Sequence, residues 1–179
     1  MSNGTIQLTT DRLVLRRHKE EDALLLHQNF GLDSEMFRYS GWNPYATEQM
    51  AGETVSQFMD SYGDTHFYGW AIEYNGRLIG TIGAYDYEPE TESIEIGCSI
   101  QRASWGQGFA GEAVKAIIAY LTEQEGIKCV KAWCAADNVG SRKVMERAGM
   151  GHVSTEKGAL EVEGKKYDRE NYIFPLNQK

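Results

Sequence analysis

Three glycines in the middle of the chain have the spacing of a phosphate-binding loop. Gly106, Gly108 and Gly111 follow the apolar run 94–100 and precede a segment with helical periodicity. In a strand–loop–helix unit of this kind, several backbone N–H groups and the positive end of a helix dipole point to one place. Glycine also allows a ligand to approach the backbone closely. The loop is therefore predicted to bind phosphate.

The same glycines spell Gly-x-Gly-x-x-Gly, the fingerprint of dinucleotide-binding folds, but their context differs from that motif. A dinucleotide loop follows its strand at once, whereas residues 101–105 intervene here. The acidic residue expected about 20 positions later falls on Glu123 or Glu125, before the next strand begins. A nucleotide P-loop needs Gly-Lys-Ser/Thr, whereas Gly111 is followed by Glu112. A dinucleotide site stays an alternative that NAD binding would reveal.

The loop resembles more closely the pyrophosphate loop of the GCN5-related N-acetyltransferase (GNAT) superfamily, Arg/Gln-x-x-Gly-x-Gly/Ala. On this sequence the pattern falls on Trp105, Gly108 and Ala110. Tryptophan in the first position departs from the general pattern and is similar to the subgroup that acetylates the N-termini of ribosomal proteins. Residues 138–150 are similar to that subgroup's other signature, an Asn-x-x-Ser helix closing in Ala/Leu-Gly-Phe, with Met150 in place of the aromatic residue. The resemblance extends from about Leu13 to Phe174.

The resemblance implies that the chain binds acetyl-coenzyme A. Backbone N–H groups of the loop would hold the pyrophosphate, and the backbone just before the loop would pair with the two amides of the pantetheine arm, as an added strand does. Asn138 would hydrogen-bond the far side of the arm, and it is also suited to cap its own helix. The predicted cofactor-binding residues are Cys98, Ser99, Ile100, Trp105, Gly106, Gln107, Gly108, Phe109, Ala110, Gly111 and Asn138.

Acetyl transfer to an amine needs a group that accepts a proton, because an alkyl ammonium has a pKa of about 10 and an N-terminal amine about 8. Glu95 is the candidate base. It lies in the middle of a strand between two isoleucines that face the other way, and a carboxylate there is costly unless it has a function. A pairing with a neighbouring strand or an exposed edge is the structural alternative for Glu95, and Glu92 is the reserve candidate.

Ser141 is the candidate acid. It stands in the first turn of the helix that Asn138 begins, and the resemblance implies that its hydroxyl protonates the departing thiolate. The structural alternative is a first-turn serine that satisfies a free backbone N–H.

Aromatic residues near two loops exceed what a small core needs, and Trp42 and Tyr85 are predicted to line the acceptor site. The resemblance implies a protein or peptide N-terminal α-amine as the acceptor, attacking directly in a ternary complex. Two alternatives stay open. The acceptor is a small-molecule amine (an amino acid, a polyamine or an antibiotic), or the chain is a non-catalytic acyl-coenzyme A sensor.

Composition sets further expectations. A chain of 179 residues, 41% hydrophobic and 25% charged, predicts one domain over residues 1–179. No apolar run approaches the length of about 18 residues that spans a membrane, and a signal-peptide layout is absent, which favours a cytoplasmic protein without membrane attachment.

The net charge of −8 argues against nucleic acid as a partner and favours a cationic substrate. Three cysteines predict no disulfide framework, four histidines lack ligand spacing for a metal, and a monomer or homodimer is expected.

Hydrophobic periodicity predicts the elements that must position these residues. Asn75-Gly76 predicts a type I′ hairpin turn, and the strand–helix–strand order over 92–136 predicts a parallel βαβ crossover. The expected fold class is α/β (α+β), a GNAT fold with a mixed, mostly antiparallel sheet of about seven strands and about four helices. The predicted strands are 12–16, 67–74, 77–85, 92–100, 128–136, 152–155 and 166–174, and the predicted helices are 20–30, 47–62, 110–125 and 138–148.

Overall fold

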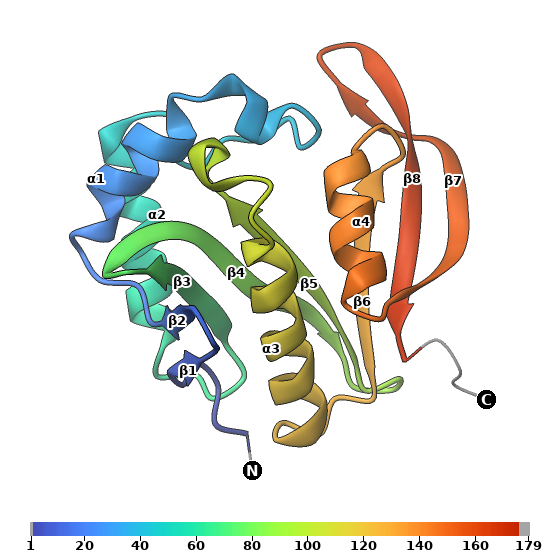
Figure 1. Ribbon diagram of the computed structural model, residues 1–179, viewed down its shortest axis with the longest axis horizontal. Helices are drawn as coiled ribbons and strands as arrows, with labels where there is room; N and C mark the ends of the chain where they lie inside the picture. The colour runs from blue at the N-terminus through green and yellow to red at the C-terminus, as the bar shows by residue number, and fades with distance from the viewer. Residues whose placement is uncertain (1, 176–179) are drawn as a thin grey trace.

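The computed structural model describes residues 2–175, which form one eight-stranded sheet in the order β1-β2-β3-β4-β5-β6-β8-β7 (Figure 1). The strands are β1 (Leu8–Thr9), β2 (Leu13–Arg16), β3 (Tyr68–Tyr74), β4 (Arg77–Glu88), β5 (Ser93–Ile100), β6 (Cys129–Ala135), β7 (Gly151–Val162) and β8 (Lys165–Phe174). The helical segments are α1 (Asp22–Leu26), the π-helical turn η1 (His27–Gly31), the 3₁₀ helices η2 (Ser34–Phe37) and η3 (Arg102–Ser104), α2 (Glu48–Ser61), α3 (Phe109–Glu123) and α4 (Val139–Arg147).

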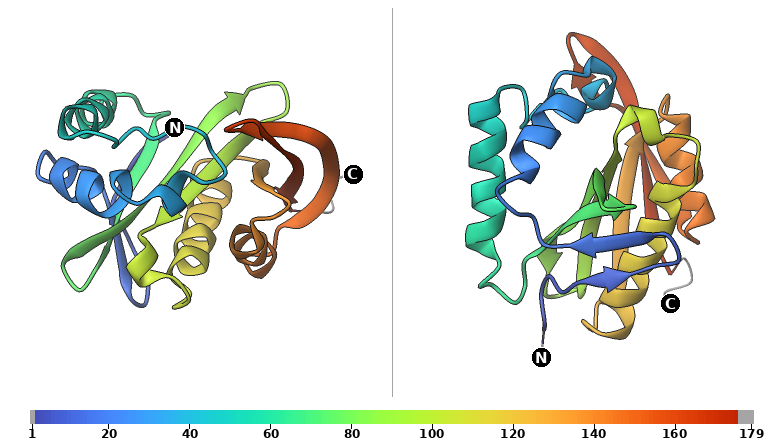
Figure 2. Two further views of the ribbon diagram at one scale, coloured as in Figure 1. Left: turned by 90° about the horizontal axis from the view of Figure 1, so that it is seen from above. Right: turned by 60° about the vertical axis from the view of Figure 1, so that its left-hand side comes forward.

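Helices cover both faces of this sheet. Figure 2 shows α1 and α2 on one face and α3 and α4 on the other. The larger hydrophobic core lies under α3 and α4 and includes Ile94, Ile117 and Val130. A smaller core under α1 and α2 includes Phe30 and Val55. Because strand side chains alternate between faces, the residues of β5 next to Ile94 point toward the α1 and α2 side.

The parallel pair β5–β6 is joined over a short stretch. Its register contains Ser93↔Cys129, Ile94↔Val130 and Glu95↔Lys131, after which the two strands diverge (Figure 1). On its other side β5 stays paired with β4 as far as Ile100. The edge of β5 that faces β6 beyond Glu95 therefore has no partner strand, and main-chain groups there are available to an extended ligand.

Local sequence signals place several elements as predicted. Asn75 and Gly76 have positive φ angles of 49° and 75° in the β3–β4 turn, as a type I′ turn requires. Thr47 begins α2 by accepting a hydrogen bond from the backbone N–H of Met50 at 3.1 Å. The α/β class and the parallel crossover are confirmed.

Three details differ from the predictions. The sheet has eight strands within residues 2–175 rather than about seven, because β1 is only two residues long and shows no periodicity. The first helix is α-helical only to Leu26 and continues as a π-helical turn. Strand β7 extends to Val162 instead of ending at 155, and its side chains are nearly all exposed, so no hydrophobic alternation marks it.

Candidate active site

The glycine loop leads from η3 into the start of α3. Gly106 and Gly108 have φ angles of 78° and 82°, which glycine adopts without strain. Gly108 is the residue that caps α3, so the N–H groups of the first turn lack partners within the helix and face outward from its positive end. The Trp105 indole donates to the carbonyl of Ile100 at 2.6 Å and thereby fixes the loop against the end of β5. This geometry fits a pyrophosphate.

Arg12 supports the loop from the N-terminal strands. Its Nη1 donates to the carbonyl of Gln107 at 2.9 Å and its Nε to Glu112 at 2.7 Å. Its guanidinium lies 4.4 Å from the centre of the Phe109 ring. The whole Phe109 residue is only 2% exposed, so the ring of this predicted cofactor residue belongs to the hydrophobic core and is not available to a ligand. A Cβ on Gly108 would meet Arg12 Nη2 at 3.4 Å, an ordinary van der Waals contact, so it is the φ of 82° that favours glycine there.

The strand that precedes the loop offers its backbone rather than its side chains. Burial raises the pKa of the Cys98 thiol to about 12, which favours the neutral thiol over the more nucleophilic thiolate. The Ile100 side chain is buried in the larger core, and Ser99 is exposed. These residues lie on the edge of β5 that lacks a partner strand. Their position fits the amides of a pantetheine arm.

Asn138 and Ser141 meet at the start of α4, on the other side of the gap. Asn138 Oδ1 accepts a hydrogen bond from the backbone N–H of Ser141 at 3.2 Å, which confirms the predicted cap and leaves the amide nitrogen of Asn138 for a ligand. Within residues 2–175 the Ser141 hydroxyl has no hydrogen-bond partner, so it does not take the structural role considered for it. Both side chains are half-buried.

Glu95 points to the face of β5 opposite Ile94 and Ile96. Its carboxylate oxygen Oε1 is buried and finds no hydrogen-bond partner in the described part of the chain. Desolvation raises the pKa of Glu95 above its ordinary value, while the positive charge of Arg169 opposes this rise. A carboxylate with a raised pKa is better matched to proton transfer near neutral pH.

Glu95 does not form an ion pair with the lysine opposite it on β6. Lys131, its partner on β6, forms an ion pair with Glu88 at 3.1 Å instead. The reserve candidate Glu92 pairs with Lys128 just before β5 begins. Both of these carboxylates form ion pairs, whereas Glu95 forms no ion pair of this kind within residues 2–175 and its Oε1 has no hydrogen-bond partner.

Tyr85 lies directly opposite Glu95 on β4 and is 46% exposed. Its hydroxyl would be 3.0 Å from a Cβ built on Gly97, so the ring leans over a glycine that leaves room for it. The protein that covers the unexposed part of the ring, and then the negative charge of Glu95, raise the pKa of Tyr85 to about 12, so its hydroxyl stays protonated. The structure thus brings Tyr85 and Glu95 together.

Trp42 lies in the segment between η2 and α2 and is 65% exposed. Within the described residues its indole makes no hydrogen bond or ring contact with Tyr85 or Glu95. The segment itself is held beside the start of α4 and against β8. The Tyr39 hydroxyl donates to the carbonyl of Asp137 at 3.4 Å, and the Tyr39 ring packs edge-on against Tyr167 of β8.

Two residues that the sequence analysis missed also surround Glu95. Trp133 of β6 and Arg169 of β8 contact each other, with the guanidinium carbon 4.7 Å from the indole centroid. Hydrogen bonding by Trp133 and the charge of Arg169 both favour the ionised form of Glu95. Strand alternation could have identified Trp133, which is two residues from Lys131. Nothing in the sequence indicated Arg169, because its place depends on how β6 pairs with β8.

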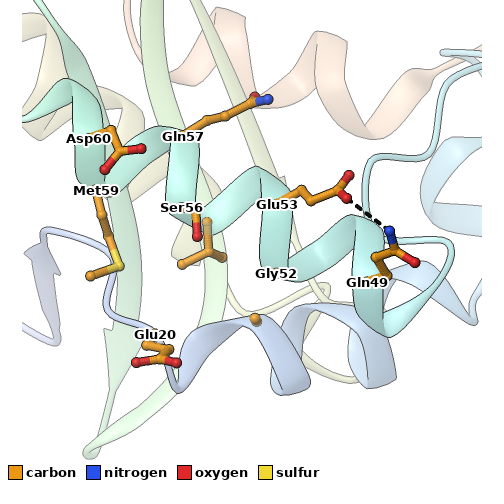
Figure 3. A pocket seen from close by; sticks show the side chains of 10 residues that line it. Glu20, Gln49, Gly52, Glu53, Ser56, Gln57, Met59 and Asp60 are labelled. Carbon is orange, nitrogen blue, oxygen red and sulfur yellow. Dashed lines mark hydrogen bonds between the residues drawn. The ribbon is translucent and has the colours of Figure 1, made fainter.

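A separate hollow lies between α1 and α2 (Figure 3). Its lining includes Glu20, Glu53 and Asp60, and Gln49 donates to Glu53 at 3.0 Å. None of the predicted site residues lines it. Among residues 2–175 no cluster of His, Cys, Asp or Glu could hold a metal ion, and no described helix is long and apolar enough to cross a membrane.

Comparison with known proteins agrees with this geometry. Residues 12–151 match the acetyltransferase (GNAT) domain family. The uncharacterized N-acetyltransferase YoaA of Bacillus subtilis is 28% identical over 167 residues, which are 92% of this chain and 94% of that protein.

Two solved structures share the fold and contain the cosubstrate or its product. RimL, the ribosomal L7/L12 alpha-N-protein acetyltransferase, in complex with coenzyme A, has a TM-score of 0.84 at 20% identity, covering 94% of this chain and 97% of RimL. The microcin C7 self immunity acetyltransferase MccE, in complex with acetyl-CoA and AMP, has a TM-score of 0.81 at 18% identity, covering 92% of each chain. The chain belongs to the GNAT family and is an N-acetyltransferase that uses acetyl-coenzyme A.

Proposed function

We propose that the chain acetylates the N-terminal α-amine of a protein or peptide by direct attack in a ternary complex, with Glu95 as base and Ser141 as acid. The observation that carries this proposal is the buried carboxylate oxygen Oε1 of Glu95, which has no hydrogen-bond partner within residues 2–175 and belongs to the last residue pair before β5 and β6 diverge. A base at that point faces an acceptor while the cosubstrate occupies the gap between the strands.

Different residues of the chain bind the cosubstrate and transfer protons. Loop residues 106–111 hold the pyrophosphate through backbone N–H groups, and residues 98–100 and the amide of Asn138 hold the pantetheine arm from either side. Acetyl-coenzyme A supplies the thioester. Glu95 accepts a proton from the acceptor ammonium, directly or through water, and the free hydroxyl of Ser141 protonates the leaving sulfur.

An N-terminal α-amine suits this arrangement better than an alkyl amine. Its pKa of about 8 is closer to neutrality than the value of about 10 for a lysine side chain, so less driving force is needed to deprotonate it. Tyr85 beside Glu95 is almost half exposed, which leaves room for the end of a chain. RimL, whose fold this chain shares, is an alpha-N-protein acetyltransferase.

A panel of acceptors tests the proposal, with thiol release as the readout. The panel holds one peptide with a free N-terminus, the same peptide with a blocked N-terminus and a free lysine, a free amino acid, a polyamine and an aminoglycoside. We expect the highest kcat/KM for the free N-terminus and little transfer to the blocked peptide. A best acceptor among the small amines would contradict the proposal. Tight coenzyme A binding without turnover on any amine would favour the sensor alternative.

A further inference from the structure

Arg169 of β8 is held in a fixed orientation, on the face of the sheet that carries Glu95. Its guanidinium stacks on the indole of Trp133 at 4.7 Å, and its Nε donates to Asn171 Oδ1 at 3.0 Å. Asn171 in turn donates to Ser154 at 3.1 Å and to Glu156 at 3.2 Å on β7. Stacking and this hydrogen-bond network therefore orient the guanidinium plane.

The outer edge of the same guanidinium has no partner. Among residues 2–175 the only ion pair of Arg169 runs from Nε to Glu156 at 3.4 Å, and its Nη1 and Nη2 atoms make no hydrogen bond. The Arg169 side chain is 34% exposed. A planar pair of N–H donors that is already oriented and still unoccupied matches a carboxylate, which accepts two parallel hydrogen bonds from such an edge.

Arg169 shares a face of the sheet with Glu95. Glu95 pairs with Lys131, and alternation places Trp133 and Ala135 of β6 on the same face as Lys131. Ala135 pairs with Arg169, so that side chain too projects from this face. Its charge acts on both Glu95 and Tyr85. A base and a cation therefore stand on opposite sides of the gap between β5 and β6, facing the same space.

We infer that Arg169 is a specificity-determining residue that binds a carboxylate carried by the acceptor beside its reacting amine, while Glu95 faces the amine. This inference rests on the proposed acetylation of an amine at Glu95. The carboxylate belongs either to an acidic side chain close to a peptide N-terminus or to a free amino acid. Both sources present the same chemistry to Arg169, and the acceptor pairs below distinguish them.

The test compares acceptors that differ only in the carboxylate. One pair of peptides has Asp or Asn as the second residue after an N-terminal alanine, and the other pair is alanine and alaninamide. We expect the intact enzyme to prefer the acidic member of at least one pair by about tenfold or more in kcat/KM, through a lower KM, because hydrogen bonds to charged groups are the strong ones. A preference in the peptide pair identifies an acidic N-terminal segment, and one in the second pair identifies a free amino acid.

The Arg169→Gln variant should lose that preference, measured at one pH as the ratio of kcat/KM between the two members of a pair, while keeping its affinity for coenzyme A. The ratio cancels the effect that the lost charge has on Glu95, because that effect acts on both members alike. Lys166→Gln is the matched control, because it removes one exposed positive charge from the same strand, and it should keep the preference. Arg169→Lys keeps a charge without the planar edge and should lose most of the preference. If Arg169→Gln does not fold, Arg169→Lys takes its place in the comparison.

The outcomes separate this inference from the proposed function. An equal kcat/KM for acidic and neutral acceptors in the intact enzyme overturns the inference alone, and so does a preference that survives in Arg169→Gln. A free amino acid as the best acceptor, with a preference that is lost in Arg169→Gln, overturns the proposed N-terminal acceptor and leaves the inference standing. Failure to acetylate any amine overturns both.

Discussion

Asp33 and Arg102 form an ion pair that ties the segment after α1 to the turn before the glycine loop, with Arg102 Nε 2.8 Å from Asp33 Oδ2. The other oxygen of Asp33 accepts a hydrogen bond from the backbone N–H of Glu35 at 3.1 Å and so begins η2. One carboxylate thus positions the chain that leads to Trp42 and connects it to the cofactor side of the site.

Replacing Asp33 should separate these two effects. Asp33→Asn keeps an oxygen for the cap and loses the ion pair, so we expect a rise of roughly 1.4- to fivefold in the KM of the acceptor, equivalent to the 0.2–1 kcal/mol of an exposed ion pair. Asp33→Ala should add a loss of about 1 kcal/mol of stability from the missing cap. Steady-state kinetics and thermal unfolding of both variants measure this. Equal acceptor KM values in all three proteins would show that the ion pair does not position the acceptor segment.

Glu95→Gln should reduce kcat/KM by about a hundredfold or more, because a positioned base contributes 10²–10⁴-fold. In the intact enzyme, kcat/KM should rise with pH as Glu95 loses its proton, above the range of an ordinary glutamate because burial raises its pKa. This rising limb should be absent in the glutamine variant. The exposed turn residue Glu90, changed to Gln, is the control and should keep the profile. A rising limb that survives in Glu95→Gln would assign the proton to water or another group.

The same variant should be more stable than the intact protein at neutral pH. Since the pKa of Glu95 is higher in the folded chain than in the unfolded chain, folding disfavours the charged form. Stability therefore falls as pH rises above the unfolded value of about 4.3, and Gln is free of this loss. Thermal unfolding at several pH values should show a difference that is small in acid and grows toward neutrality.

Trp105→Phe should weaken coenzyme A binding several-fold while the protein stays folded. The substitution removes the indole N–H that donates to Ile100, a hydrogen bond of about 1 kcal/mol net. Calorimetry with coenzyme A measures the change. Trp42→Phe is the control, because within residues 2–175 the Trp42 indole makes no hydrogen bond to the loop, and the affinity of this variant for coenzyme A should not change. An unchanged affinity in Trp105→Phe would mean that the loop is fixed by Arg12 alone.

Ser141→Ala should lower kcat with little change in coenzyme A affinity, because a group that protonates the leaving sulfur acts mainly in the transition state. The backbone N–H of Ser141 still reaches Asn138, so α4 keeps its cap. Asn138→Ala should instead lose about 1 kcal/mol of stability and bind coenzyme A more weakly. If Ser141→Ala keeps the full kcat, the proton reaches the sulfur by another route.

The sequence predicts the parts of the site that depend on local signals. Asn75-Gly76 specifies its turn, and Asn138 specifies the start of α4, because each acts on residues within three positions of itself. Contacts between distant segments leave no such signal. Arg12 reaches Gln107 across 95 positions, and Arg169 reaches Trp133 only because β6 pairs with β8. The loop was therefore predictable and its support was not.

The short ladder between β5 and β6 also has a mechanical consequence. Because three residue pairs join the strands at one end, the Glu95–Lys131 pair is the last point at which β5 and β6 are held together. A change in the angle between the two strands would therefore displace Glu95 little and would displace the far ends more, where Ile100 and Ala135 lie. Arg169, the partner of Ala135, is at the far end. We expect such a change to alter the width of the gap and the distance between Glu95 and Arg169 together, with the base as the fixed point.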